Sequence, residues 1–111
     1  MYELEELPQA ANNSAPVMQF RELIPRRFIT PAYPAIAEQM GIEGYVIVQF
    51  TVLQDGSVSD ISVRESDPPG TFDNEALLAA TRLRFEPRLQ FGAPVVVEDV
   101  TYRFDWRLPN R

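Results

Sequence analysis

The side chains most able to do chemistry in this sequence are a few aspartates and serines. They are Asp55, Asp60, Asp73, Ser57, Ser59, Ser62 and Ser66. Carboxylates serve as general acids and bases, and a serine attacks a substrate only when a neighbouring base takes its proton. The sequence contains no histidine to act as that base, and none of these serines lies in a Gly-x-Ser-x-Gly turn. Each aspartate also has a predicted structural role in a turn, a bulge or a helix cap. The sequence therefore predicts a protein that is not an enzyme.

The composition removes further classes of site. The 111 residues include no cysteine and no histidine, which removes disulfides, thiol nucleophiles and the commonest metal ligand. No metal and no cofactor is expected. The formal net charge is −6, whereas a nucleic-acid-binding surface needs a basic stripe to neutralise phosphates. No nucleic-acid partner is expected either.

The feature that points to a function is a long alternating run at the end of the chain, Val95–Leu108. Its predicted inward-facing members are Val96, Glu98, Val100, Tyr102, Phe104, Trp106 and Leu108. Charged and polar residues occupy most positions between them, and side chains of a strand point alternately to opposite faces. The run therefore predicts an antiparallel strand with one buried face and one solvated face. Charged side chains such as Arg103 are typical of a sheet edge that must not pair at random.

A second alternating run begins at Gly44. Its apolar members share one predicted face: Val46, Val48, Phe50 and Val52. The turn that follows contains Asp55-Gly56, which is the strongest short hairpin signal. Apolar spacing in the return strand is irregular, which predicts a β-bulge near Ser59–Asp60.

Two short helices are predicted beside these strands. The first runs from Pro34 to a glycine C-cap at Gly41, and its predicted buried face is Tyr33, Ile36, Ala37 and Met40. The second begins near Asp73, and its predicted apolar stripe is Phe72, Ala76, Leu77, Ala80 and Leu83. A loop is predicted over Leu89–Pro94.

This order of elements predicts an α+β fold with two short helices packed on one face of a three-stranded antiparallel sheet. A short extra strand before the first helix, within Met18–Ile24, is also considered. Residues 1–17 are acidic, contain two prolines and lack a periodic apolar face, so they are predicted to form a flexible linker, with a short capping helix as the alternative. The folded domain is then expected over residues 18–111.

Several motifs occur in an order that is similar to one known family. They are Tyr33-Pro34, Gly41-Ile42-Glu43-Gly44, Val48-x-Phe50, Asp55-Gly56-x-Val58, Phe72 leading to Ala76, Arg84-Phe85-Glu86-Pro87 and the long final strand. Over about Pro25 to Leu108 the chain resembles the C-terminal domain of TonB-type energy transducers. Two positions depart from the family pattern: Leu83 stands where many members carry tryptophan, and Ala32 where glutamine is frequent.

The resemblance implies a periplasmic domain, anchored in the bacterial inner membrane by an N-terminal helix that is not present here. It implies work with the ExbB–ExbD motor and binding of the "TonB box" of outer-membrane transporters for siderophores, haem or cobalamin. In the family, the box adds as a strand beside the last strand of the sheet.

The resemblance also implies two groups of partner-binding residues. The strand-pairing group is Val97, Asp99, Val100, Thr101, Tyr102, Arg103, Phe104 and Asp105. The group expected to contact the receptor plug is Pro31, Ala32, Tyr33 and Pro34.

Two other functions use the same strand. The edge could pair with a second copy and give a strand-exchanged homodimer. The domain could also be an envelope adaptor of the TolA type, whose C-terminal domain has a similar arrangement of layers.

Overall fold

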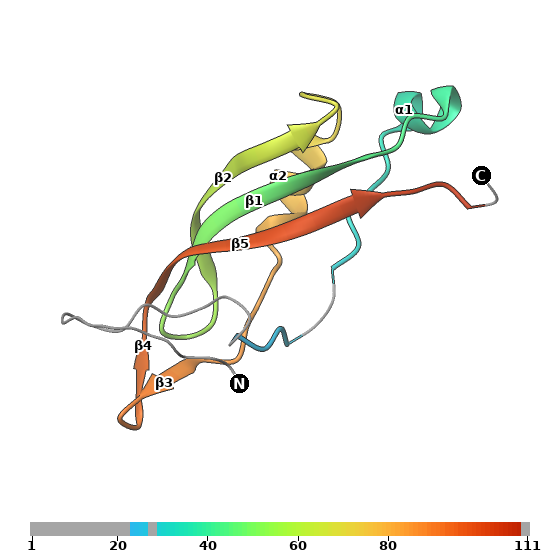
Figure 1. The fold of residues 1–111 in the computed structure, drawn as a ribbon. Helices are drawn as coiled ribbons and strands as arrows, with labels where there is room; N and C mark the ends of the chain where they lie inside the picture. Colours follow the sequence, from blue (N-terminus) through green and yellow to red (C-terminus); the bar gives the residue numbers. More distant parts are fainter. Residues whose placement is uncertain (1–22, 27–28, 110–111) are drawn as a thin grey trace.

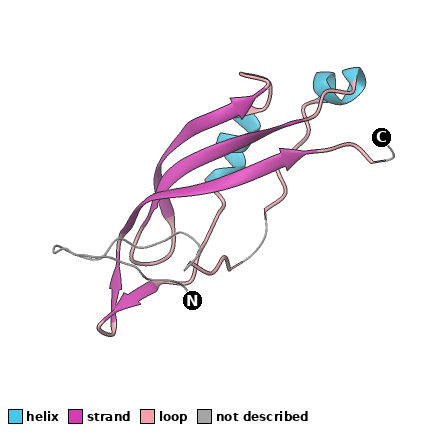
Figure 2. Ribbon diagram, in the orientation of Figure 1, coloured by secondary structure: helices cyan, strands magenta, loops and turns pink. Residues whose placement is uncertain are grey.

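A three-stranded antiparallel sheet with a helix across one face forms the centre of the molecule (Figure 1). The structure is a computed structural model that describes residues 23–26 and 29–109. Its elements are α1 (Ala35–Met40), β1 (Gly44–Val52), β2 (Val58–Asp67), α2 (Asp73–Ala80), β3 (Arg88–Gln90), β4 (Ala93–Val95) and β5 (Val97–Trp106). The strand order is β2-β1-β5, while β3 and β4 form a separate two-stranded sheet (Figure 2). The predicted α+β class is confirmed.

Residues 1–22 lie outside the described part, so the linker over 1–17 stays a prediction. The same holds for most of the extra strand considered within Met18–Ile24. Just after that stretch, Pro25 forms a single antiparallel bridge with Phe85. The N–H of Glu86 donates to the carbonyl of Ile24 at 2.8 Å, so this segment lies beside the chain that follows α2.

The core lies between the sheet and α2. The predicted inner face of β1 is confirmed, because Val46, Val48, Phe50 and Val52 are all buried. Against it pack buried residues of the second helical region: Phe72, Ala76, Ala79, Ala80, Leu83 and Phe85. The Phe72 ring stacks on Trp106 at the end of β5, with ring centroids 4.6 Å apart. The aromatic residues of the last strand therefore hold it on the core.

The hairpin β1–β2 forms as predicted, including its bulge. Gln49 is paired with Ser62 and Thr51 with Ser59, so β2 carries one extra residue there, and Asp60 has φ 55°. A second register shift, which the sequence did not indicate, separates the partners of Ile47 and Val48. The prediction that Thr71 or Asp73 caps α2 is wrong, because the N-cap is Phe72 and no side chain caps the helix. The Asp73 carboxylate instead accepts the N–H of Gly70, before the helix, at 3.2 Å.

Asp55 fixes the hairpin turn. Its carboxylate accepts hydrogen bonds from the Ser57 hydroxyl at 2.6 Å and from the Ser57 N–H at 3.0 Å. These bonds favour the ionised carboxylate and hold the pKa of Asp55 below its usual value. A lowered folded-state pKa contributes stability above the unfolded-state pKa, and that stability is lost as the pH falls through the folded-state pKa.

We therefore expect Asp55→Ala to lower the free energy of unfolding at neutral pH and to lower it less in acid. Urea unfolding at neutral and at acidic pH measures both differences. Ser57→Ala is the matched variant, since it removes the hydroxyl donor and keeps the N–H donor, and it should lose less. An equal loss for Asp55→Ala at both pH values would contradict this role.

The prediction for the buried face of α1 is wrong in part. Ile36 and Met40 are 70% and 69% exposed, and only Ala37 of the helix is buried. The reason is that residues flanking the helix fill the core in its place, namely Tyr33 before it and Ile42 after it. The C-cap is confirmed, since Gly41 has φ 71°.

The inward set predicted for the last strand is also wrong at its beginning. Val96 is 46% exposed, whereas Val97 is buried at 2%. Phe50 pairs with Val100 and Val52 pairs with Val97, so β5 has one residue more than β1 in this interval. Asp99, with φ 59°, lies in this bulge. The bulge reverses the alternation, and from Val100 onward the predicted inward set holds.

The loop predicted over Leu89–Pro94 is instead a hairpin. Strands β3 and β4 pair antiparallel around the two residues Phe91 and Gly92, whose φ angles are 53° and 82°. Two successive residues with positive φ form the type I′ turn that joins strands tightly. This turn was not predicted from the sequence, because phenylalanine is rarely found at a positive φ.

Candidate functional site

The strand β5 lies at the border of the three-stranded sheet. One side pairs with β1 over its whole length, from Gly44 opposite Trp106 to Val52 opposite Val97. Within the described ranges no strand pairs with the other side. The main chain on that side is therefore available to another strand.

The two borders of the sheet differ in regularity. Strand β2 forms the other border, and two register shifts interrupt it, at Asp60 and between the partners of Ile47 and Val48. In β5 the shift lies near the beginning, at Asp99. Pairing with β1 then continues without interruption from Val100 to Trp106. Because bulges disrupt strand pairing, this stretch of β5 is the longer regular edge.

The eight residues predicted for strand pairing all lie on β5, but they divide into two kinds. Val97, Val100 and Phe104 are buried in the core, and Tyr102 is half-buried. The remaining members point to the face opposite α2, which we call the solvent face: Asp99, Thr101, Arg103 and Asp105. The buried members hold the strand on the core, so the open edge presents mainly its backbone.

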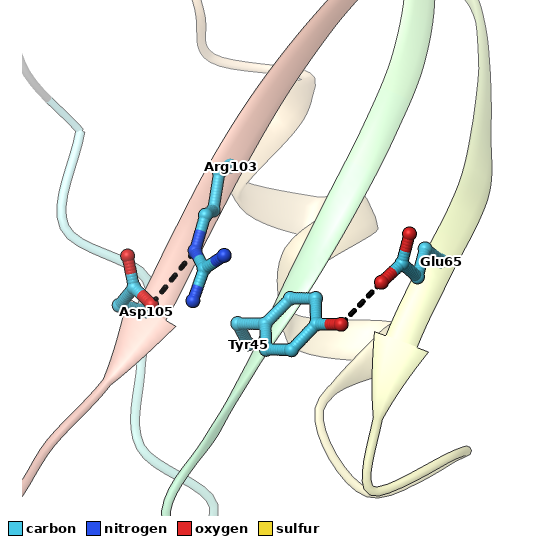
Figure 3. A network of polar contacts seen from close by, with 4 residues as sticks. All are labelled: Tyr45, Glu65, Arg103 and Asp105. Carbon is cyan, nitrogen blue, oxygen red and sulfur yellow. Dashed lines mark hydrogen bonds and ion pairs between the residues drawn. The ribbon is translucent and has the colours of Figure 1, made fainter.

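The side-chain face of a residue also fixes the direction of its N–H and C=O groups, because all residues share one chirality. In Figure 3 the arrow of β5 points down, β1 lies on its right, and the solvent-face side chains point toward the viewer. In this arrangement the N–H and C=O groups of the solvent-face residues point left, away from β1. The main chain of Thr101, Arg103 and Asp105 therefore faces the open edge, and that of the residues between them faces β1.

A network of polar side chains covers the solvent face (Figure 3). The Arg103 guanidinium pairs with Asp105 at 3.0 Å and lies over the Tyr45 ring, 4.1 Å from its centroid. The Tyr45 hydroxyl donates to Glu65, and this bond, together with the negative charges of Glu65 and Asp67, raises the pKa of Tyr45. The contact with Tyr45 draws the long Arg103 side chain toward β1. The Arg103 guanidinium therefore lies over the sheet.

The second predicted group of residues adjoins one end of β5. The indole N–H of Trp106 donates to the carbonyl of Ala32 at 2.9 Å. The Tyr33 hydroxyl donates to the carbonyl of Ile42 at 2.5 Å, and its ring meets Phe72 edge-on. The stretch Pro31–Pro34 is therefore fixed beside the carboxyl end of β5, and the two predicted groups lie next to each other.

Some residues that shape this site were not predicted. Glu43 accepts the N–H of Leu108 at 2.7 Å and so holds the chain just beyond β5. Gln49 donates to Asp99 at 3.3 Å and accepts from Arg64 at 2.9 Å, which supports the bulge from the solvent face. Glu43 lies within the Gly-Ile-Glu-Gly motif, so the family resemblance could have suggested it as a site residue. No motif in the sequence specifies Gln49.

Two kinds of feature are absent from the part of the chain that the structure describes. No group of three or more acidic residues is placed to hold a metal ion within residues 23–26 and 29–109. In the same part of the chain, neither helix has the length and apolar character needed to cross a bilayer.

Comparison with known proteins identifies the family of this sheet. The family model for the Gram-negative bacterial TonB protein C-terminal matches residues 29–108. The chain belongs to this family.

Individual relatives agree with this assignment. Protein TonB of Pseudomonas aeruginosa is 40% identical over 90 residues, which cover 81% of this chain and 26% of the relative. Protein TonB of Escherichia coli is 40% identical over 57 residues, which cover 51% of this chain and 24% of the relative. The solution NMR structure of the Pseudomonas aeruginosa TonB CTD superimposes with a TM-score of 0.67 and 40% identity, covering 80% of this chain and 89% of that one. The chain thus spans about a quarter of the length of the two TonB proteins.

The structure shows the surroundings of the two residues that depart from the family pattern. Leu83, where many TonB C-terminal domains carry tryptophan, is fully buried. Leu83 is therefore a core residue of this domain. The Ala32 side chain is exposed, while its carbonyl accepts the Trp106 hydrogen bond. At this position the observed contact is made by the main chain.

Proposed function

We propose that this domain is the receptor-binding part of an energy transducer, and that it binds the TonB box of outer-membrane transporters as an additional strand on β5. The observation that carries the proposal is the open, regular edge from Val100 to Trp106. The domain would work in the periplasm, joined through a membrane anchor outside this sequence to the proton-driven ExbB–ExbD complex. The transported substrates would be siderophores, haem or cobalamin.

Backbone pairing suits a domain that must recognise many transporters. Main-chain hydrogen bonds give affinity without reading side chains, and a few pockets then add selectivity. Roughly five such bonds contribute about 0.5–1.5 kcal/mol each, whereas ordering a flexible segment costs about 1–2 kcal/mol per residue. Pairing alone is therefore weak. We expect a dissociation constant on the order of micromolar, with contacts beyond the ladder making up the difference.

Titration of the isotope-labelled domain with TonB-box peptides from several transporters tests the proposal. The amide signals of Val97–Trp106 and of Ala32–Tyr33 should shift, because a strand added to β5 passes beside both. Signals of β2 serve as the internal control and should stay in place. Shifts confined to β2, or no shifts at peptide concentrations on the order of a millimolar, would overturn the proposal.

A second candidate function uses the same edge for self-association. The open side of β5 offers the same backbone groups to another copy of β5, and strand exchange is a simple route to dimers. Sedimentation at increasing protein concentration measures it directly. If the domain is a dimer and added box peptide dissociates it, peptide and second copy compete for one edge.

A further inference from the structure

The hairpin β3–β4 and the residue after it form an arm, Arg88–Val96, with an unusual amount of exposed apolar surface. Phe91 at its tip is 99% exposed, Leu89 is 56% exposed and Val96 is 46% exposed. Pro94 is exposed as well. The arm extends from the amino end of β5, away from the helices (Figure 1).

These apolar residues are not scattered. Leu89 lies directly opposite Pro94, so their side chains share one face of the hairpin. On the other face Arg88 lies opposite Val95, and Val95 packs against the core. The face with Leu89 and Pro94 is therefore directed away from the domain. Single exposed apolar residues need no explanation, but a contiguous exposed group typically marks a contact surface.

Phe91 makes the arm more unusual, because its φ of 53° lies in the left-handed region. Asparagine or glycine fits this position of a type I′ turn at lower cost, so phenylalanine is strained here. The position thus combines backbone strain with a fully exposed aromatic ring. Backbone strain of this kind clusters at functional sites.

The arm is also continuous with the open edge. A single residue, Val96, separates β4 from β5. A strand that pairs with β5 from Trp106 back to Val100 meets the bulge at Asp99, where regular pairing ends. Any segment continuing in that direction then passes the exposed carboxylates of Glu98 and Asp99 and reaches the arm.

We infer that the arm is a second contact for the same extended segment that pairs with β5, and that it binds the flank of that segment. This inference rests on the proposed function. The flank would carry a basic residue beside Glu98 and Asp99, followed by an aromatic or large aliphatic side chain against Leu89 and Phe91. The backbone ladder then gives general affinity, and the arm selects among partners by the sequence next to the paired residues.

The surroundings favour a peptide over a bilayer surface or a second copy. Glu98 and Asp99 at the base of the arm repel an anionic membrane. The net charge of −6 opposes self-association through the same surface. A peptide segment that is extended, positively charged and apolar is not repelled by these carboxylates or by the net negative charge.

The experiment uses matched synthetic peptides and isothermal titration calorimetry. The reference peptide is a TonB-box segment alone. Two test peptides add the tripeptide Phe-Ser-Arg before it or Arg-Ser-Phe after it, which covers both strand directions, and two control peptides add Ser-Ser-Ser instead. One of the two test peptides should bind at least about tenfold more tightly than the reference, as expected for one buried aromatic anchor. The serine controls should match the reference.

Variants of the arm decide whether the gain comes from this surface. Phe91→Asn combined with Leu89→Thr should reduce the gain to less than about threefold. Asparagine tolerates positive φ, so the thermal midpoint should not fall. Leu78→Gln is the matched control, because it removes an apolar side chain of similar exposure (62%) from α2, and it should keep the full gain.

The outcomes separate this inference from the proposed function. If all peptides shift the amides of β5 equally and the arm variant changes nothing, the inference fails and the proposed function stands. If no peptide shifts β5, the proposed function fails and takes the inference with it. Binding of the wild type to phosphatidylethanolamine and phosphatidylglycerol vesicles, lost in the arm variant, would also overturn the inference, as would an arm-dependent dimer in sedimentation.

Discussion

Arg103→Pro is expected to weaken binding of a TonB-box peptide at least about tenfold while the domain stays folded. The N–H of residue 103 faces the open edge, so proline deletes one hydrogen bond of the added strand and places its ring where that strand would lie. Strand pairing with β1 is spared, because proline is tolerated on edge strands where the missing N–H faces solvent. Calorimetry with one box peptide measures the loss, and circular dichroism checks the fold.

Two matched variants isolate the backbone from the side chain. Arg103→Ala removes the contacts with Asp105 and Tyr45 but keeps the N–H, and it should bind the peptide within about threefold of the wild type. Tyr102→Pro removes an N–H that faces β1 and should destabilise the sheet itself. Equal loss of affinity in Arg103→Ala and Arg103→Pro would mean that the side chain, and not the edge, binds the partner.

Trp106→Ala should have the largest effect on stability among the site residues, lowering the free energy of unfolding by about 3–5 kcal/mol. The side chain is 2% exposed and stacks on Phe72. Its removal leaves a cavity where the carboxyl end of β5 meets the core. Chemical unfolding followed by circular dichroism gives the value.

The variant Trp106→Phe separates packing from hydrogen bonding. It keeps an aromatic ring on Phe72 but leaves the carbonyl of Ala32 without the indole donor, at a cost of about 1 kcal/mol. Amide signals near Ala32 should move, and those of the Asp55 turn should not. An unchanged Ala32 environment would show that Trp106 does not position the Pro31–Pro34 stretch.

The parts of this fold that could be predicted are those with a local signature. Alternation in β1 and the Asp55-Gly56 turn define one hairpin within about twenty residues of sequence, and irregular spacing in β2 reveals its bulge at Asp60. The C-cap at Gly41 follows from the need for positive φ. None of these features depends on which segment of the chain lies next to which.

The features that were not predicted depend on backbone conformations that are unusual for the residue types that adopt them. Asp99 and Phe91 both have positive φ. A glycine at either position would have suggested a positive φ from the sequence, whereas aspartate and phenylalanine do not. The first reverses the alternation at the start of β5, and the second turns an expected loop into the arm. The exposure of Ile36 was hidden for another reason: a helical pattern gives the apolar face but not the partner that covers it.

For the candidate site, the sequence predicted the strand β5 but not which segments of the chain lie beside it. Position at a border of the sheet follows from the order β2-β1-β5, which is set by pairing between residues far apart, such as Val46 and Phe104. The Trp106–Ala32 hydrogen bond likewise joins residues separated by most of the domain. The expectation that both segments contact a partner came from the family resemblance. The structure adds that they are neighbours.

Amide hydrogen exchange of single residues tests most directly whether a partner strand pairs with the backbone of β5. With a saturating TonB-box peptide, the amides of Thr101, Arg103 and Asp105 should exchange at least about tenfold more slowly, because each now donates to the added strand. The amides between them already face β1 and should change little. If the peptide is bound and the exchange of Thr101, Arg103 and Asp105 is unchanged, β5 is not the edge that binds it.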